Sequence, residues 1–301
     1  MKPIRSTPLL ALALVTACAG SSAPSQATSD SAASAAAPVA YTIDSDPQDS
    51  VIFEQRMSLS KSQRMDTLPI GEIVVRMGRT FVGAPYIPGS LEAPGTEHLV
   101  VNLRSFDCVT FVENSLALAR TIRDHGDYHH FQRELVHIRY RAGRLGEYPS
   151  RLHYFSDWIA DNERKGIMRN MTRDLGGAAD PEPIRFMTSH VPSYRQLSDT
   201  AFVRTIAAQE QQLTRAGHFV LPEGAIAGAA ARIQNGDVIA AATTVPGLDI
   251  AHTGIALWEN GQLRLMHAPL VGTMVQISET TIADRIIAAK TQDGIMVARP
   301  R

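Results

Sequence analysis

Two cysteines occur in this chain of 301 residues, and Cys108 is the one whose surroundings suggest chemistry. It follows Asp107 and begins an apolar run that predicts a buried helix over residues 108–122. Asp107 is a good N-cap, so Cys108 is expected in the first helical turn. Free backbone N–H groups and the helix dipole there would lower the pKa of the thiol and activate it. Cys108 is therefore a candidate nucleophile; the alternative is a free cysteine that packs as a small hydrophobe.

Two histidines could act as a base for this thiol and as the group that orients the base. Asn260-Gly261 separates two β-like runs and predicts a hairpin with a two-residue turn. The resulting register places His267 opposite Gly254, and it puts His252 and His267 on one face as diagonal neighbours. A one-residue bulge would instead place the two histidines on opposite faces.

The elements that would position these residues form a helical half and a strand half. Apolar periodicity predicts helices over residues 68–81, 108–122, 131–140 and 152–165. After residue 236, short β-like runs follow at 237–241, 252–258 and 262–268. This order predicts an α+β domain with a mostly antiparallel sheet. Residues from about 170 to 230, with a helical run at 199–216, are predicted to be an insertion or a lid.

The N-terminus predicts export and lipid attachment. Lys2 and Arg5 precede an apolar stretch that is too short to span a bilayer. The run Val15-Thr16-Ala17-Cys18 resembles the bacterial lipobox, which implies a signal peptide over residues 1–17 and a lipid on the sulfur of Cys18. Ala19, rather than Asp, follows Cys18, which resembles the sorting signal of outer-membrane lipoproteins. This resemblance implies an outer-membrane lipoprotein that faces the periplasm. The alternative is a simple secretory signal and a soluble periplasmic protein.

Composition divides the rest of the chain into a linker and a domain. Residues 18–48 are rich in Ser, Ala and Pro and predict a flexible linker, whereas residues 49–301 have a globular composition. If Cys18 carries lipid, Cys108 is the only thiol left, without a disulfide partner in an oxidising compartment. A net charge of -1 and the lack of a basic run argue against a nucleic-acid partner.

Several further runs match one family in order. The run from Phe106 to Glu113, FDCVTFVE, resembles the nucleophile motif of the N-acetylmuramoyl-L-alanine amidase-like family, within the NlpC-type cysteine peptidases of the bacterial cell wall. The resemblance extends to Gly83-Ala84-Pro85-Tyr86 and to residues 148–158, 236–239, 247–256 and 266–268. It implies a papain-like NlpC-type fold, in which the nucleophile helix packs on the sheet.

The resemblance also implies a role for each matching residue. Cys108 would be the nucleophile, His252 the general base and acid, and His267 the residue that orients His252. The hydroxyl of Tyr86 would help the backbone N–H of Cys108 to hold the oxyanion; the alternative is an aromatic residue at the edge of the core.

The activity implied is that of a lipid-anchored periplasmic cysteine hydrolase without a cofactor. It would cleave an amide bond of peptidoglycan or muropeptides through a thioester, either the bond between N-acetylmuramic acid and L-alanine or the γ-D-glutamyl–diamino acid bond. Two other functions stay open: a non-catalytic wall-binding lipoprotein, and acyl transfer or thioester cleavage on lipid substrates.

A cluster of histidines raises the question of a metal. His125 and His129 are four residues apart, His130 is adjacent, and His137 follows. A zincin helix needs Glu directly after its first histidine, and Gly126 stands there. We therefore predict a solvated loop and no metal site at these residues.

Overall fold

The computed structural model of this protein describes residues 41–270 and 273–301. The predicted signal peptide, Cys18 and most of the predicted linker lie outside these residues. The domain begins at Tyr41 rather than at residue 49, because β1 (Ile43–Ser45) pairs in parallel with β2 (Leu99–Val101), and α1 (Pro47–Ser62) follows at once. In the described part of the chain, no helix is long and apolar enough to cross a bilayer.

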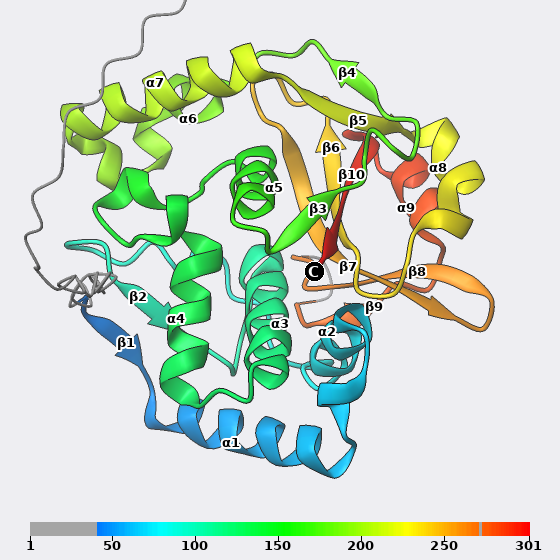
Figure 1. Ribbon diagram of the computed structural model, residues 1–301. Coiled ribbons are helices and arrows are strands. Elements are labelled where there is room, and N and C mark those ends of the chain that lie inside the picture. Colours follow the sequence, from blue (N-terminus) through cyan, green and yellow to red (C-terminus); the bar gives the residue numbers. More distant parts are fainter. Residues whose placement is uncertain (1–40, 271–272) are drawn as a thin grey trace, which may run out of the picture. The chain divides into compact units, whose positions relative to one another are not determined.

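An antiparallel sheet of eight strands forms the centre of the described domain (Figure 1). The strand order is β4-β5-β10-β6-β7-β8-β9, and β3 also pairs with β10. The strands are β3 (Met168–Asn170), β4 (Ala178–Asp180), β5 (His218–Pro222), β6 (Val238–Thr243), β7 (Ile250–Glu259), β8 (Gln262–His267), β9 (Gln276–Ile277) and β10 (Gln292–Pro300). The prediction of a helical half followed by a mostly antiparallel sheet is confirmed.

Alternating side chains give this sheet two apolar faces. On β6, Val238 and Ala240 join the main core, to which α2 (Ile70–Arg79) and α3 (Cys108–Arg123) contribute. The intervening Ile239 and Ala241 join a second core, which α8 (Glu223–Ala229) and α9 (Ile282–Ala288) cover. Figure 1 shows α2 and α3 on one side of the sheet and α8 and α9 on the other. The helix that begins with Cys108 is thus held directly against the strands that carry the histidines.

The remaining helices lie around α3. In Figure 1, α4 (Tyr128–Arg139) runs beside α3, α1 lies below both, and α5 (Phe155–Arg164) lies between α3 and α7 (Thr200–Ala216). The predicted helices are therefore present, with ends that shift by a few residues.

Residues 170–230, predicted as an insertion or a lid, contribute to two different parts of the domain. Their ends supply β4, β5 and α8 to the sheet and to its second face. Their middle contains α6 (Phe186–Ser189) and α7, which form a third apolar cluster with Tyr148 and Tyr154. We call residues 184–216 the lobe.

Candidate active site

Cys108 is the first residue of α3, as predicted. The Asp107 side chain accepts a hydrogen bond from the Thr110 backbone N–H at 2.7 Å, and Thr110 Oγ1 accepts one from the Asp107 backbone N–H at 2.9 Å. This reciprocal capping box fixes the start of the helix. Cys108 is partly exposed and lines a cleft of about 300 Å³.

The net shift of the Cys108 pKa is opposite in direction to the activation expected from the helix terminus. Burial, reinforced by the nearby Asp107 carboxylate, raises the pKa of the Cys108 thiol to about 12. The backbone amides of Thr253, Cys108 and Val109 oppose this rise, but burial outweighs them. The resting side chain at neutral pH is therefore a thiol, and a base must remove its proton.

The two histidines meet as the hairpin register predicts. Glu259 pairs with Gln262, the ladder continues to Ile255 opposite Met266, and Nε2 of His252 lies 2.7 Å from Nδ1 of His267. Gly254 makes this approach possible, since a Cβ there would lie 2.9 Å from the Cβ of His267 and 2.7 Å from the Met266 carbonyl oxygen. No bulge interrupts β7 on this side, so both imidazoles share one face.

Both imidazoles are neutral near pH 7. Burial and, to a lesser extent, Arg285 lower the pKa of His252 to about 4. Burial, the neighbouring His252 and Arg285 lower the pKa of His267 to about 2. A neutral pair of rings shares one proton between the two facing nitrogens, so one ring donates and the other accepts. This contact holds the ring of His252 in one orientation.

Tyr86 lies near the same thiol. Its backbone forms a parallel bridge with Phe106, two residues before Cys108, and its N–H donates to the Thr273 carbonyl at 2.7 Å. Burial raises the pKa of Tyr86, and the nearby Cys108 and Asp107 side chains raise it further. Helix α3 packs against β7, and the Thr253 amide, next to His252 in sequence, lowers the pKa of Cys108, so the structure brings Cys108, Tyr86, His252 and His267 to one region.

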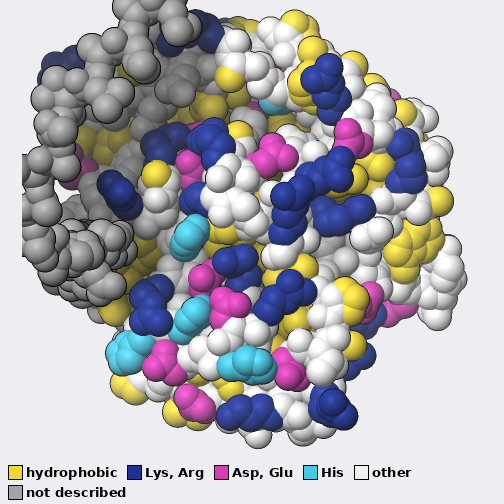
Figure 2. Space-filling model, in the orientation of Figure 1, with side chains coloured by type: hydrophobic (Ala, Val, Ile, Leu, Met, Phe, Trp, Pro, Cys, Tyr) yellow, Lys and Arg dark blue, Asp and Glu magenta, His cyan; other side chains and the backbone are white. Residues whose placement is uncertain are grey.

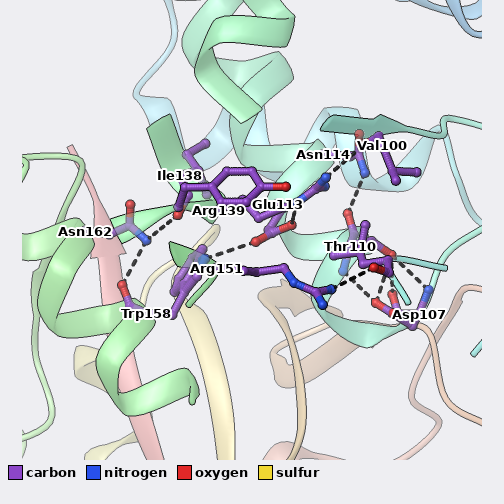
Figure 3. A network of polar contacts seen from close by, with 12 residues as sticks. Val100, Asp107, Thr110, Glu113, Asn114, Ile138, Arg139, Arg151, Trp158 and Asn162 are labelled. Atoms are coloured by element: carbon purple, nitrogen blue, oxygen red, sulfur yellow. Dashed lines mark hydrogen bonds and ion pairs between the residues drawn. The ribbon is translucent and has the colours of Figure 1, made fainter. Parts of the chain in front are cut away.

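A buried polar network below the cleft was missed by the sequence reasoning (Figure 3). Arg139 Nε donates to Glu113 Oε2 at 2.7 Å, and Trp158 Nε1 donates to Glu113 Oε1 at 3.2 Å. Arg139 Nη1 also donates to the Val100 carbonyl at 2.7 Å, which ties α3, α4, α5 and β2 together. The only sequence signal was Glu113, the single carboxylate of the helical run over residues 108–122.

The cleft beside Cys108 has walls from four parts of the chain. These are α3, the segment just before α5, the lobe and the residues that lead into β7; besides these four, residues 89–92 and Arg139 of α4 also line it. The lining residues include Glu92, Cys108, Arg151, His153, Met187, Tyr194, Asp249 and Ala251. Arg151 is itself neutralised, because it pairs with Glu92 and lies 3.4 Å from Glu97. The sequence placed Arg151 and His153 in a matching motif but assigned neither a role.

The histidine cluster considered as a metal site lies mostly on a helix, and the predicted loop is wrong. His129, His130 and His137 lie on α4, because Asp127 caps that helix by accepting from the His130 N–H at 2.8 Å. Among the described residues, Asp124, His130 and Glu134 bring three ligand atoms within 4.8 Å of one another.

Charge balance nevertheless favours an ion-pair network at this cluster. Arg120 donates to Glu134, and His130 Nε2 lies 3.4 Å from Asp124. Figure 2 shows histidines interspersed with acidic and basic side chains on this face of the molecule. The group occupies the end of α3 opposite Cys108, about 24 Å away at the rise of an α-helix, and so does not belong to the cleft.

Comparison with known proteins agrees with this geometry. Residues 76–295 match the N-acetylmuramoyl-L-alanine amidase-like (AmiA-like) family. The chain is similar to the crystal structure of an N-acetylmuramoyl-L-alanine amidase from Bacteroides uniformis, with 33% identity, a TM-score of 0.73, and coverage of 77% of this chain and 99% of that one.

Two further structures are similar. A Bacteroides fragilis protein, provisionally described as a xylanase, is 34% identical over 74% of this chain and 99% of its own, with a TM-score of 0.68. A Legionella pneumophila protein shares the fold at 22% identity, with a TM-score of 0.61 and coverage of 83% of this chain and 96% of that one. No curated protein sequence matches this chain. The capped cysteine helix, the paired histidines and the match over residues 76–295 lead to one conclusion: this chain belongs to the N-acetylmuramoyl-L-alanine amidase-like family.

Proposed function

We propose that this protein hydrolyses an amide bond of peptidoglycan, or of its muropeptide fragments, through a thioester on Cys108. The observation that carries the proposal is the contact of 2.7 Å between His252 and His267, next to a thiol at the start of a capped helix. A nucleophile, a base and a group that orients the base form the arrangement that acyl transfer requires. Membership of an amidase-like family directs this chemistry towards the cell wall.

The protonation states define the first step. For His252 to act as the base, its Nε2–H must donate to Nδ1 of His267, so that Nδ1 of His252 is unprotonated and basic. That nitrogen takes the proton of the Cys108 thiol while the sulfur attacks the carbonyl carbon. Because burial raises the pKa of the thiol, the sulfur depends on His252 to remove its proton in this step. The Thr253 amide stabilises the negative sulfur as it forms.

The later steps return the proton. The carbonyl oxygen becomes an oxyanion that the Cys108 N–H and the Tyr86 hydroxyl stabilise, by about 2.7–4 kcal/mol for each donor of this kind. Protonated His252 gives its proton to the leaving amine, the carbon–nitrogen bond breaks, and a thioester remains. Water then attacks the thioester with His252 as the base, which releases a carboxylic acid and restores the thiol.

The bond we propose lies between N-acetylmuramic acid and L-alanine. Similarity at 33% identity to the Bacteroides uniformis protein, which carries the name of that activity, supports this choice. The γ-D-glutamyl–diamino acid bond is the alternative, because the same residues would cleave it. The capped cysteine helix against an antiparallel sheet with two histidines also supports the papain-like, NlpC-type architecture.

Mass spectrometry of digested muropeptides tests the proposed bond. Release of the intact stem peptide with a free L-alanine amine, together with the sugar as a free lactyl acid, is the expected result. A shortened stem that stays on the sugar would overturn the choice of bond. No hydrolysis of any muropeptide would favour the wall-binding alternative.

The site of action follows from the lipobox-like run at residues 15–18. We place the protein at the outer membrane, facing the periplasm, with a lipid on Cys18. Cys18→Ala should then release the full chain from the membrane fraction into the soluble periplasm. An unchanged membrane fraction in that variant would contradict lipid anchoring at Cys18.

A further inference from the structure

His153 lines the same cleft as Cys108 but has no part in the mechanism above. It lies just before α5, and its ring packs on Tyr148 with 4.4 Å between ring centroids. The lobe covers this end of the cleft with Met187 and Tyr194. His153 is thus a polar side chain at the wall where a bound substrate would extend beyond the reacting carbonyl.

The hydrogen bonds of His153 determine its tautomer. Nε2 lies 2.9 Å from the carbonyl oxygen of Tyr148, and a carbonyl only accepts, so Nε2 carries the hydrogen. The ring is neutral, because burial and the nearby Arg151 lower the pKa of His153 to about 3. Nδ1 therefore carries a lone pair and can only accept.

Within the described residues Nδ1 has no hydrogen-bond partner, and it is not among the polar atoms sealed away from solvent. The side chain is partly exposed, and the cleft is the cavity that it lines. Two neighbouring charged side chains of this wall already have partners: Arg151 pairs with Glu92, and Asp249 accepts from the Ser156 N–H at 2.7 Å. Nδ1 of His153 is thus a fixed acceptor without a partner, beside two charged groups that are already paired.

We propose that His153 is a specificity-determining residue that accepts, through Nδ1, a hydrogen bond from an amide N–H of the substrate. This inference rests on the proposed function, because it assumes that the cleft binds a muropeptide. Two amide N–H groups lie close to the proposed scissile bond: the first N–H of the stem peptide beyond L-alanine, and the acetamido N–H of the sugar. A ligand without that N–H would leave the acceptor unpaired, which disfavours its binding.

The test measures binding in the full chain with Cys108→Ala, so that no hydrolysis intervenes. Three ligands are compared by calorimetry: the muropeptide, the same molecule with the peptide N–H replaced by an ester oxygen, and the same molecule with the acetamido N–H replaced by an ester oxygen. One of the two replacements should weaken binding about tenfold, which is the size of one unmade hydrogen bond. The replacement that does so identifies the source of the donor.

The variant His153→Ala should also bind the unmodified muropeptide about tenfold more weakly, and in it the sensitive replacement should have less than about a twofold further effect. His190→Ala, a variant of an exposed lobe histidine whose Nδ1 bonds within α6, should leave all three affinities unchanged. If His153→Ala unfolds, His153→Phe takes its place, because the phenyl ring keeps the packing against Tyr148 and lacks the acceptor.

If each ester replacement weakens binding by the same factor with His153 present and with His153→Ala, the role of His153 is overturned. The absence of muropeptide binding would also overturn it. Hydrolysis by the wild-type protein is measured separately, so failure of the proposed function is distinguishable from failure of this inference.

Discussion

The buried ion pair between Glu113 and Arg139 should be among the most sensitive points of the fold. Each residue is 1% exposed, and the pair joins α3, the helix that begins with Cys108, to α4. In Arg139→Leu, the carboxylate of Glu113 would keep one partner, the indole N–H of Trp158 at 3.2 Å. A buried carboxylate without its cation is costly, so we expect a large loss of stability.

The size of the loss follows from the contacts. Arg139 donates to Glu113 and to the Val100 carbonyl, each at 2.7 Å, and hydrogen bonds of a charged group contribute about 1.5–3 kcal/mol each. The lost contacts give about 3–6 kcal/mol, in line with the roughly 3–5 kcal/mol measured when one partner of a buried pair is removed. About 4 kcal/mol corresponds to a fall in Tm of roughly 8–16 °C for a domain of this size.

Urea unfolding at pH 7, followed by circular dichroism, measures this effect. Adding Glu113→Gln to Arg139→Leu removes the unpaired charge and keeps an acceptor for Trp158, so the double variant should be more stable than Arg139→Leu alone. The control is Arg133→Leu, on the exposed side of α4, the helix that also carries Arg139. It should change the free energy of unfolding by less than about 0.5 kcal/mol. A loss below about 1 kcal/mol for Arg139→Leu, or no recovery in the double variant, would refute the reasoning.

Three further perturbations address the histidines and the oxyanion. Gly254→Ala would place a Cβ 2.9 Å from that of His267, so we expect a loss of about 1–3 kcal/mol in thermal unfolding and a fall in kcat; unchanged stability and kcat would contradict this close approach. The pKa of His252 is about 4 in the fold against 6.5 unfolded, so the unfolded state binds the extra proton between these values. The stability that neutral His252 contributes is present above pH 6.5 and is lost towards pH 4, by about 3 kcal/mol. Urea unfolding measured across this pH range should therefore show a smaller loss of stability on acidification for His252→Asn than for the wild type. Tyr86→Phe should lower kcat by about 100-fold or more with little change in KM if the hydroxyl stabilises the oxyanion; an unchanged kcat would instead make Tyr86 an aromatic residue at the core edge.

Local sequence signals predicted the parts of the site that depend on local geometry. Asn260 and Gly261 both adopt positive φ, 52° and 75°, as a tight hairpin turn requires, and this turn determined the register of the two histidines. Asp107 and Thr110 form a cap within one turn of chain. Such features involve neighbours that are close in sequence, so the residue types alone indicate them.

Features that depend on distant contacts were missed or misjudged. The pair formed by Glu113 and Arg139 joins two helices, and the pKa of Cys108 depends on how much protein surrounds the thiol. The helix terminus lowers that pKa, but the sequence does not show the larger opposing effect of burial. Residues 43–45 were predicted to be part of the linker, because a strand of three residues is too short to show an alternating pattern of side chains. They form a strand because they pair with residues 99–101.

The most direct test of the central claim compares hydrolysis of a muropeptide by the wild-type protein and by Cys108→Ala. Cys108 lines the cleft and Cys108→Ala removes only its sulfur, so the substitution should change the thermal unfolding little and make the comparison one of chemistry. We predict that mass spectrometry finds the intact stem peptide released by the wild type, and none above the uncatalysed background with Cys108→Ala. Release of the same product at a similar rate by Cys108→Ala would show that another group performs the cleavage.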